Sequence, residues 1–205
     1  MLKCDKDRIE NFNKFGNIMI DIETLSNKSN ASVIAVAAVE FNKYTGDVGD
    51  TFIEYVNPKY WCNYNGDTDG ETIAWWMTQD ADTLRHMVEN CQKSENSFSS
   101  VLMYLSSFIK DHDSPKTEDT DIVVWGNGSI MDIGILRDGY NKFSIPVPWK
   151  FWAINDVRTI VALNPSIKEE TEFIGERHNP LDDCLHQIKY LSKTIQSLYI
   201  KPISK

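Results

Sequence analysis

The segment NIMIDIE, from Asn17 to Glu23, decides how this sequence is interpreted. Its alternating apolar residues predict a β-strand from Asn17 to about Ile22. Alternate side chains of a strand point to the same face, so Asp21 and Glu23 project together while Ile22 points back into the core. Two neighbouring carboxylates repel each other unless a cation neutralises them. The pair is therefore either part of a site for a divalent metal, which prefers oxygen ligands, or a solvated strand end.

Two more strands are predicted directly after this segment. SVIAVAAVEFN, from Ser32 to Asn42, has the continuous apolar character of a buried strand, and TFIEYVN, from Thr51 to Asn57, alternates well. The turn residues TGD, from Thr45 to Asp47, lie between them. Three consecutive strands with short connections predict an antiparallel meander.

The rest of the chain alternates helices with a further strand. Helical patterns begin at about Glu71 and again at Ser97, where the amphipathic stretch runs to His112. A short buried strand is expected at 121–127, and helices are expected at 129–140, 156–164 and 180–198. Strands first, followed by helices and at least one further strand, indicate an α/β fold with a mixed sheet.

The bulk properties indicate one soluble domain. The length of 205 residues fits a single domain, which we expect at residues 17–205 after an N-terminal extension at residues 1–16. The N-terminus lacks the apolar centre of a signal peptide, and no apolar run is long enough to cross a bilayer. The four cysteines have no zinc-finger spacing. We therefore expect a cytoplasmic protein with reduced thiols and no membrane partner.

The net charge of −9 limits how this protein can bind nucleic acid. It argues against a protein that grips a long nucleic acid through a basic face. An enzyme that takes only the end of a strand remains compatible with it, because metal ions held by acidic side chains can meet the phosphate. Such an enzyme is expected to bind its substrate weakly without metal.

A second acidic position occurs in WGNGSIMDIGIL, from Trp125 to Leu136. Asp132 follows a short apolar strand and lies early in a predicted helix. There it either contributes to a site or stabilises the N-terminal end of the helix dipole.

A third acidic position occurs in HNPLDD, which begins at His178. Asn179 suits a helix N-cap, and Pro180 suits the first helical position. His178 then lies just outside the helix and Asp183 one turn inside it. Only one of the adjacent pair Asp182 and Asp183 can face the site, and we assign Asp183 to it.

Together these segments resemble the three motifs of the DnaQ-like, DEDDh exonucleases. DIET matches the first motif, D-x-E, the aspartate after an apolar strand matches the second, and HNPLDD matches the third, H-x-x-x-x-D. Two further stretches, TIAWWMTQ at 72–79 and KFWAINDVRT at 150–159, are similar to phage exonuclease A and to the ribonuclease-T-like exoribonucleases of mycobacteria. The similar segments cover about residues 17–198.

The resemblance implies a ribonuclease-H-like fold and a 3′→5′ exonuclease that hydrolyses phosphodiester bonds by a two-metal mechanism. It implies that two divalent ions, Mg²⁺ or Mn²⁺, are held by Asp21, Glu23, Asp132 and Asp183. His178 is then the general base, a role that histidine side chains commonly take in catalysis near neutral pH. The alternative is a catalytically inactive module of the same fold that binds nucleic-acid ends. The presence of all five residues favours the enzyme.

The expected substrates and partners follow from the same relatives. The phage enzymes imply DNA and the ribonuclease-T-like enzymes imply RNA, so the partner is the 3′ end of single-stranded RNA, DNA or both. A homodimer follows by analogy only. The chain departs from the pattern at Pro180, where a small residue is usual, and at Leu25, where glycine is frequent.

Aromatic side chains can stack on the terminal base of such a substrate. The candidates in the two matched stretches are Trp75, Trp76, Phe151 and Trp152, each with core packing as the alternative. Arg158 is a candidate to anchor a phosphate or a structural carboxylate. Asp156, two residues earlier, is expected to cap the helix that follows it.

Overall fold

The computed structural model describes residues 16–62, 66–111 and 122–200, and most of the predicted N-terminal extension lies outside this part. Its five-stranded sheet has the order β3-β2-β1-β4-β5. Strands β1 (Asn17–Thr24), β2 (Val33–Phe41) and β3 (Val48–Tyr55) form an antiparallel meander on one side of the sheet. Strands β4 (Val123–Gly126) and β5 (Ile154–Asp156) run parallel to β1 and complete the sheet. The predicted meander and mixed α/β sheet are confirmed.

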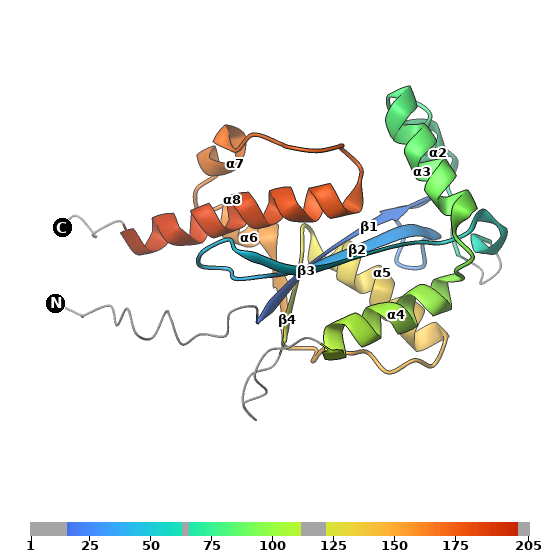
Figure 1. Cartoon of the computed structure of the whole chain (residues 1–205), viewed down its shortest axis with the longest axis horizontal. Helices are drawn as coiled ribbons and strands as arrows, with labels where there is room; N and C mark the ends of the chain where they lie inside the picture. The colour runs from blue at the N-terminus through green and yellow to red at the C-terminus, as the bar shows by residue number, and fades with distance from the viewer. Residues whose placement is uncertain (1–15, 63–65, 112–121, 201–205) are drawn as a thin grey trace.

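Helices cover both faces of this sheet and extend beyond one end of it (Figure 1). They are η1 (Pro58–Tyr60), α2 (Gly70–Trp76), α3 (Ala81–Lys93), α4 (Phe98–Asp111), α5 (Ser129–Lys142), α6 (Val157–Val161), α7 (Ser166–Glu170) and α8 (Pro180–Ile200). No helix in the described part of the chain has the length and apolar character needed to cross a membrane.

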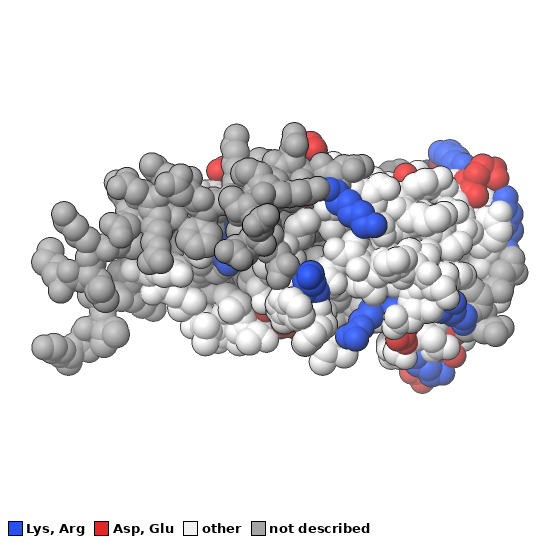
Figure 2. Space-filling view, turned by 90° about the horizontal axis from the view of Figure 1, so that it is seen from below, with Lys and Arg blue, Asp and Glu red and all other residues white. Residues whose placement is uncertain are grey.

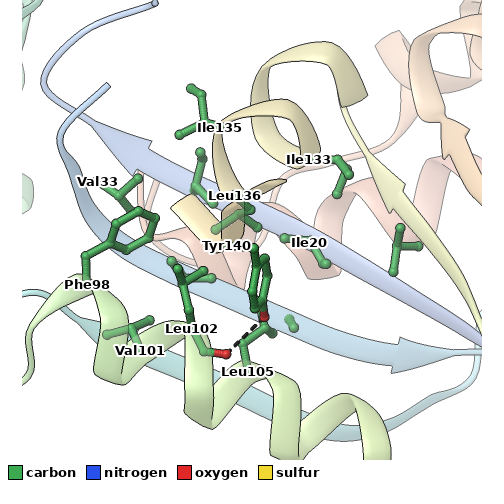
Figure 3. Packing of buried hydrophobic residues seen from close by; sticks show 14 of the residues in the cluster. Ile20, Val33, Phe98, Val101, Leu102, Leu105, Ile133, Ile135, Leu136 and Tyr140 are labelled. Atoms are coloured by element: carbon green, nitrogen blue, oxygen red, sulfur yellow. Dashed lines mark hydrogen bonds between the residues drawn. The ribbon is translucent and has the colours of Figure 1, made fainter. Parts of the chain in front are cut away.

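Alternation along β1 separates the two larger of the three buried clusters among the described residues. Ile18, Ile20 and Ile22 pack on the side of α4 and α5, so the predicted inward direction of Ile22 is confirmed. Figure 3 shows this core, in which the Tyr140 hydroxyl donates a hydrogen bond of 2.9 Å to the Leu102 carbonyl and joins the two helices. Burial of these side chains fixes which way β1 faces.

The opposite face of β1 lies under α8, which runs along the sheet in Figure 1. Met19 belongs to the core on this side, together with Trp125 from β4 and Leu191 from α8. By the same alternation Asp21 and Glu23 also point to the α8 side. The strand therefore presents its two carboxylates to the beginning of a long, firmly packed helix.

Several short elements differ from the sequence prediction. The helical region from about residue 71 is two helices: α2 ends at Trp76, and Asp80 then caps α3 by accepting hydrogen bonds from Asp82 N and Thr83 N. The predicted helix 156–164 is only α6, preceded by the three-residue strand β5. Strands and helices of three to five residues carry too little periodicity to be recognised from sequence.

Figure 2 shows the face on the α4 side of the molecule, where Lys and Arg are scattered among uncharged side chains. Over the described residues of this face, no continuous basic stripe is formed.

Candidate active site

The tip of β1, the start of α8 and the α2–α3 pair meet at one end of the molecule (Figure 1). There Glu23, His178 and Asp183 each present a possible ligand atom, and these atoms all lie within 4.8 Å of one another. Asp21 and Glu23 are both partly buried at the strand end. The structure thus brings the first and third sequence motifs together.

Asp132 reaches the same cluster from the first turn of α5, where it is 8% exposed. A sharp turn between β4 and α5 makes this possible. Gly128 caps α5 with a φ of +108°, a conformation that favours glycine. A Cβ on Gly126 would lie only 3.2 Å from Asp132 Oδ2, so glycine leaves the space for this carboxylate. The sequence signal for the sharp turn and for the space beside Asp132 is GNG, at residues 126–128 between the strand and the helix. The sequence analysis assigned no function to these glycines.

The start of α8 has the geometry that the sequence predicted. Asn179 caps the helix by accepting a hydrogen bond of 3.1 Å from Leu181 N, and Pro180 is its first residue. Asp183 Oδ2 accepts a 3.0 Å hydrogen bond from the backbone N–H of His178. Asp182 turns away and accepts a 2.8 Å hydrogen bond from Glu176 N. The adjacent acids therefore have different partners: Asp183 belongs to the cluster, and Asp182 bonds to the loop before it.

Electrostatics distinguish these carboxylates from ordinary surface acids. Burial, then the charges of Asp132 and Asp183, raise the pKa of Asp21 well above its usual value. Burial, then Asp21 and Asp183, do the same to the pKa of Glu23. Burial raises the pKa of Asp132 to about 7, although the nearby Arg158 charge opposes the shift. Carboxylates that repel one another in this way fit a hard divalent cation, which accepts oxygen ligands and offsets their charge.

Aromatic rings form a wall beside the histidine. Trp75, which is 43% exposed, contacts the His178 ring edge-on, with ring centroids 4.9 Å apart. Trp76 is 4% exposed and donates a hydrogen bond of 2.9 Å from Nε1 to the Thr24 carbonyl. Trp76 is thus a structural residue that fixes α2 to the end of β1, and Trp75 is the ring available to a ligand.

The two other aromatic candidates, Phe151 and Trp152, lie away from the site. They precede β5, whose first residue pairs with Val124, and Val124 pairs with Ile18 near the start of β1. Because these strands are parallel, the two exposed rings lie toward the opposite end of β1 from Asp21. The expectation that they stack on a substrate base is not supported by this geometry.

The residues that follow β5 lie at the same end of the parallel strands as the site. Asp156 caps α6 by accepting a hydrogen bond from Thr159 N, as predicted, and it also accepts one of 2.7 Å from Ser129 N at the start of α5. The Arg158 guanidinium lies against Gly128, where an added Cβ would be 3.1 Å from Cζ. Its positive charge acts on the Asp132 carboxylate. Of the two expectations for Arg158, this supports an anchor for a carboxylate of the protein over an anchor for a phosphate.

Comparison with solved structures identifies the fold. The chain is similar to the nuclease domain of 3′hExo, a DEDDh family member bound to rAMP, with a TM-score of 0.60 and 15% identity over 95% of this chain and 98% of that one. It is also similar to S. pombe Pop2p in an Mg²⁺- and Mn²⁺-bound form, with a TM-score of 0.61 and 12% identity over 97% and 88% of the two chains. A zinc-bound E. coli ExoI–ssDNA complex matches with a TM-score of 0.56 and 13% identity over 88% of this chain and 39% of that one. The fold is therefore the ribonuclease-H-like fold of the DEDDh 3′ exonucleases.

The family follows from the sequence match. A family model described as the 3′-5′ exoribonuclease Rv2179c-like domain matches residues 16–195, and the chain belongs to this family. No curated protein matches the chain. The resemblance inferred from the three motifs is confirmed, and a 3′-5′ exonuclease is the class of enzyme that family and fold support.

Proposed function

We propose that this protein is a metal-dependent 3′→5′ exonuclease that hydrolyses the terminal phosphodiester bond of single-stranded RNA. The observation that carries the proposal is the meeting of four acidic side chains and one histidine at the end of β1, with the pKa values of Asp21 and Glu23 raised well above their ordinary values. An arrangement of charges this unfavourable is retained where a cation offsets it.

The carboxylates of Asp21, Glu23, Asp132 and Asp183 would hold two divalent cations, Mg²⁺ or Mn²⁺. When bound, such a pair supplies charge stabilisation for the attacking and leaving oxygens of a phosphodiester. The four side chains come from β1, α5 and α8, which are joined through the two buried cores. The protein therefore positions the ligands before substrate arrives, and little reorganisation is needed.

His178 would remove the proton from the attacking water. Its backbone has a φ of +64°, which is unusual for a residue other than glycine, and its N–H is fixed to Asp183. The backbone is thus held by a ligand residue, while the ring lies at the rim of the cluster beside Trp75. This position suits a group that exchanges protons with solvent.

Trp75 would provide the surface on which the terminal base stacks. It is the exposed member of the Trp75–Trp76 pair, and it lies next to the proposed base. Stacking on an aromatic ring is tolerant of base identity, which suits an enzyme that removes successive nucleotides. RNA is proposed as the main substrate because the family description names an exoribonuclease.

The proposal is tested with 5′-end-labelled single-stranded RNA and DNA, each incubated with Mg²⁺, Mn²⁺ or EDTA. We expect a ladder that shortens from the 3′ end with either metal, no cleavage in EDTA, and faster cleavage of RNA. Internal cuts, or intact substrate with both metals, would contradict the proposal, and preference for DNA would contradict only the choice of RNA.

A further inference from the structure

Gln187 contacts the candidate metal cluster from a position that no sequence motif marks. It follows Asp183 by four residues on α8, so both side chains lie on the same face of the helix. Its side-chain Nε2 donates a hydrogen bond of 2.8 Å to Asp21 Oδ1. The residue is 4% exposed, so this contact is made in the protein interior, beneath the carboxylates.

The burial of this amide requires an explanation. Its Oε1 is buried and has no hydrogen-bond partner among the described residues. A buried amide that makes only one of its bonds costs stability relative to an apolar side chain of similar size. Packing alone would therefore favour leucine or methionine at this position, and the hydrogen bond to Asp21 is the feature that a glutamine adds.

We propose that Gln187 is a positioning residue that fixes the orientation of the Asp21 carboxylate for divalent-metal binding. The charges of Asp132 and Asp183 both act on Asp21 and repel its carboxylate. A single donor on Oδ1 restricts rotation of the carboxylate and directs its remaining lone pairs toward the other acids. Helix α8 thereby supplies one metal ligand, Asp183, and the group that orients another.

This inference rests on the proposed metal-dependent function. Groups that hydrogen-bond a metal ligand commonly change metal affinity or activity by about 10- to 100-fold when they are removed. Gln187→Met retains the approximate length and volume of the side chain and removes the donor. We expect it to weaken Mn²⁺ binding by about 10- to 100-fold, as measured by isothermal titration calorimetry on the metal-free protein.

A matched control is available on the same helix. Gln196 is exposed and donates to the Tyr44 carbonyl, about 13 Å further along α8. Gln196→Met makes the same chemical change and should leave Mn²⁺ affinity at the wild-type value. The nuclease activity of Gln187→Met should recover toward wild type as Mn²⁺ is raised, because the defect lies in binding the ion.

A measurement on the unaltered protein keeps the inference testable if Gln187→Met folds poorly. In an amide NMR spectrum, the side-chain NH₂ signals of Gln187 should shift when Mg²⁺ is added, and those of Gln196 should not. Wild-type Mn²⁺ affinity in a folded Gln187→Met protein, or Gln187 signals that Mg²⁺ leaves unchanged, would overturn the assignment. Absence of metal binding by the wild-type protein would instead overturn the proposed function.

Discussion

The candidate site has two parts that are built in opposite ways. The carboxylate part is formed by regular elements: Asp21 and Glu23 come from β1, Asp132 from α5 and Asp183 from α8. Buried side chains on both sides of the sheet hold these elements together. The histidine part is formed by the loop before α8, in which His178 has a positive φ.

Contacts around the histidine are fewer and nearer to solvent. The ring of His178 is bordered by the edge of Trp75. Two residues earlier in the loop, Glu176 pairs with His86 of α3 at 2.9 Å, and the His86 side chain is 59% exposed. An exposed pair of this kind contributes little to stability. The described contacts of this loop are ring contacts of His178 with Trp75 and Trp76, backbone hydrogen bonds to Asp182 and Asp183, and this ion pair.

The difference suggests that the two parts have different functions, with metal binding in the carboxylate part and proton transfer in the histidine part. Repelling carboxylates keep their positions only when a rigid framework holds them, so they are placed on strands and long helices. A general base must exchange its proton with water in each turnover, and a loop at the rim allows this. Substitutions in the carboxylate part should abolish metal-dependent chemistry, whereas substitutions in the histidine part should leave metal binding intact.

The largest effect is expected for Asp183→Asn. Loss of one of four proposed metal ligands should lower kcat by on the order of 10³-fold or more, since metal catalysis contributes several kcal/mol. Mn²⁺ binding measured by calorimetry should weaken as well. Asp182→Asn is the matched control, because Asp182 bonds to the loop at Glu176 N and an asparagine oxygen can still accept that bond. Equal losses of kcat and Mn²⁺ affinity in the two variants would show that the structure of the helix start, and not a metal ligand, causes the effect.

The next largest effect is expected for His178→Ala. Removal of a general base should lower kcat by about 10²- to 10⁴-fold while Mn²⁺ affinity stays near the wild-type value. His86→Ala is the control for simple loosening of the loop and should change kcat by no more than about fivefold. Loss of Mn²⁺ binding in His178→Ala would make this residue a metal ligand and would remove the contrast between the two parts. Wild-type turnover would eliminate it as the base.

Trp75→Ala should produce a smaller change that falls on substrate binding. Stacking on an aromatic ring contributes about 1–3 kcal/mol per base, so KM for single-stranded RNA should rise by roughly 10-fold, with a lesser change in kcat. Trp76→Phe, which removes the hydrogen bond to Thr24, should instead lower the free energy of unfolding by about 1 kcal/mol and leave KM unchanged. Steady-state kinetics and denaturant unfolding separate the two. A Trp75→Ala enzyme with wild-type KM would exclude stacking.

A separate effect, on stability and not on catalysis, is expected as a pH dependence of the metal-free protein. The pKa of Asp132 is raised by burial to about 7, above its ordinary value of 3.8. The folded state therefore retains a proton that the unfolded chain releases, and stability falls as pH rises from about 4 to about 7. The melting temperature in EDTA should decline over this range, and less steeply in Asp132→Asn. Identical slopes for the two proteins would contradict the raised pKa.

The sequence predicted the parts of this protein that depend on periodicity and helix capping. Alternation placed Ile22 in the core, and the Asn179–Pro180 helix start separated Asp182 from Asp183. These are local properties, since each depends on residues within one turn or one strand. They were sufficient for the mixed sheet, whereas the meeting of the first and third motifs was implied only by the resemblance to known exonucleases.

The parts that depend on contacts between distant segments could not be predicted in this way. Phe151 and Trp152 lie in a stretch that matches relatives, but the parallel pairing of β5 carries them away from Asp21. Gln187 was missed because its partner is 166 residues away in sequence. The order of strands in the sheet decides the first case, and the packing of α8 on β1 decides the second. No local pattern encodes either of them.

The most direct test of the central claim is to locate the metal ions. Crystals grown without metal and soaked in Mn²⁺ should show two anomalous difference peaks among Asp21, Glu23, Asp132 and Asp183, about 3.5–4 Å apart. The same experiment on Asp183→Asn should lose at least one of the peaks. Absence of anomalous density among these carboxylates in soaked wild-type crystals, with Mn²⁺ bound elsewhere or not at all, would contradict the account.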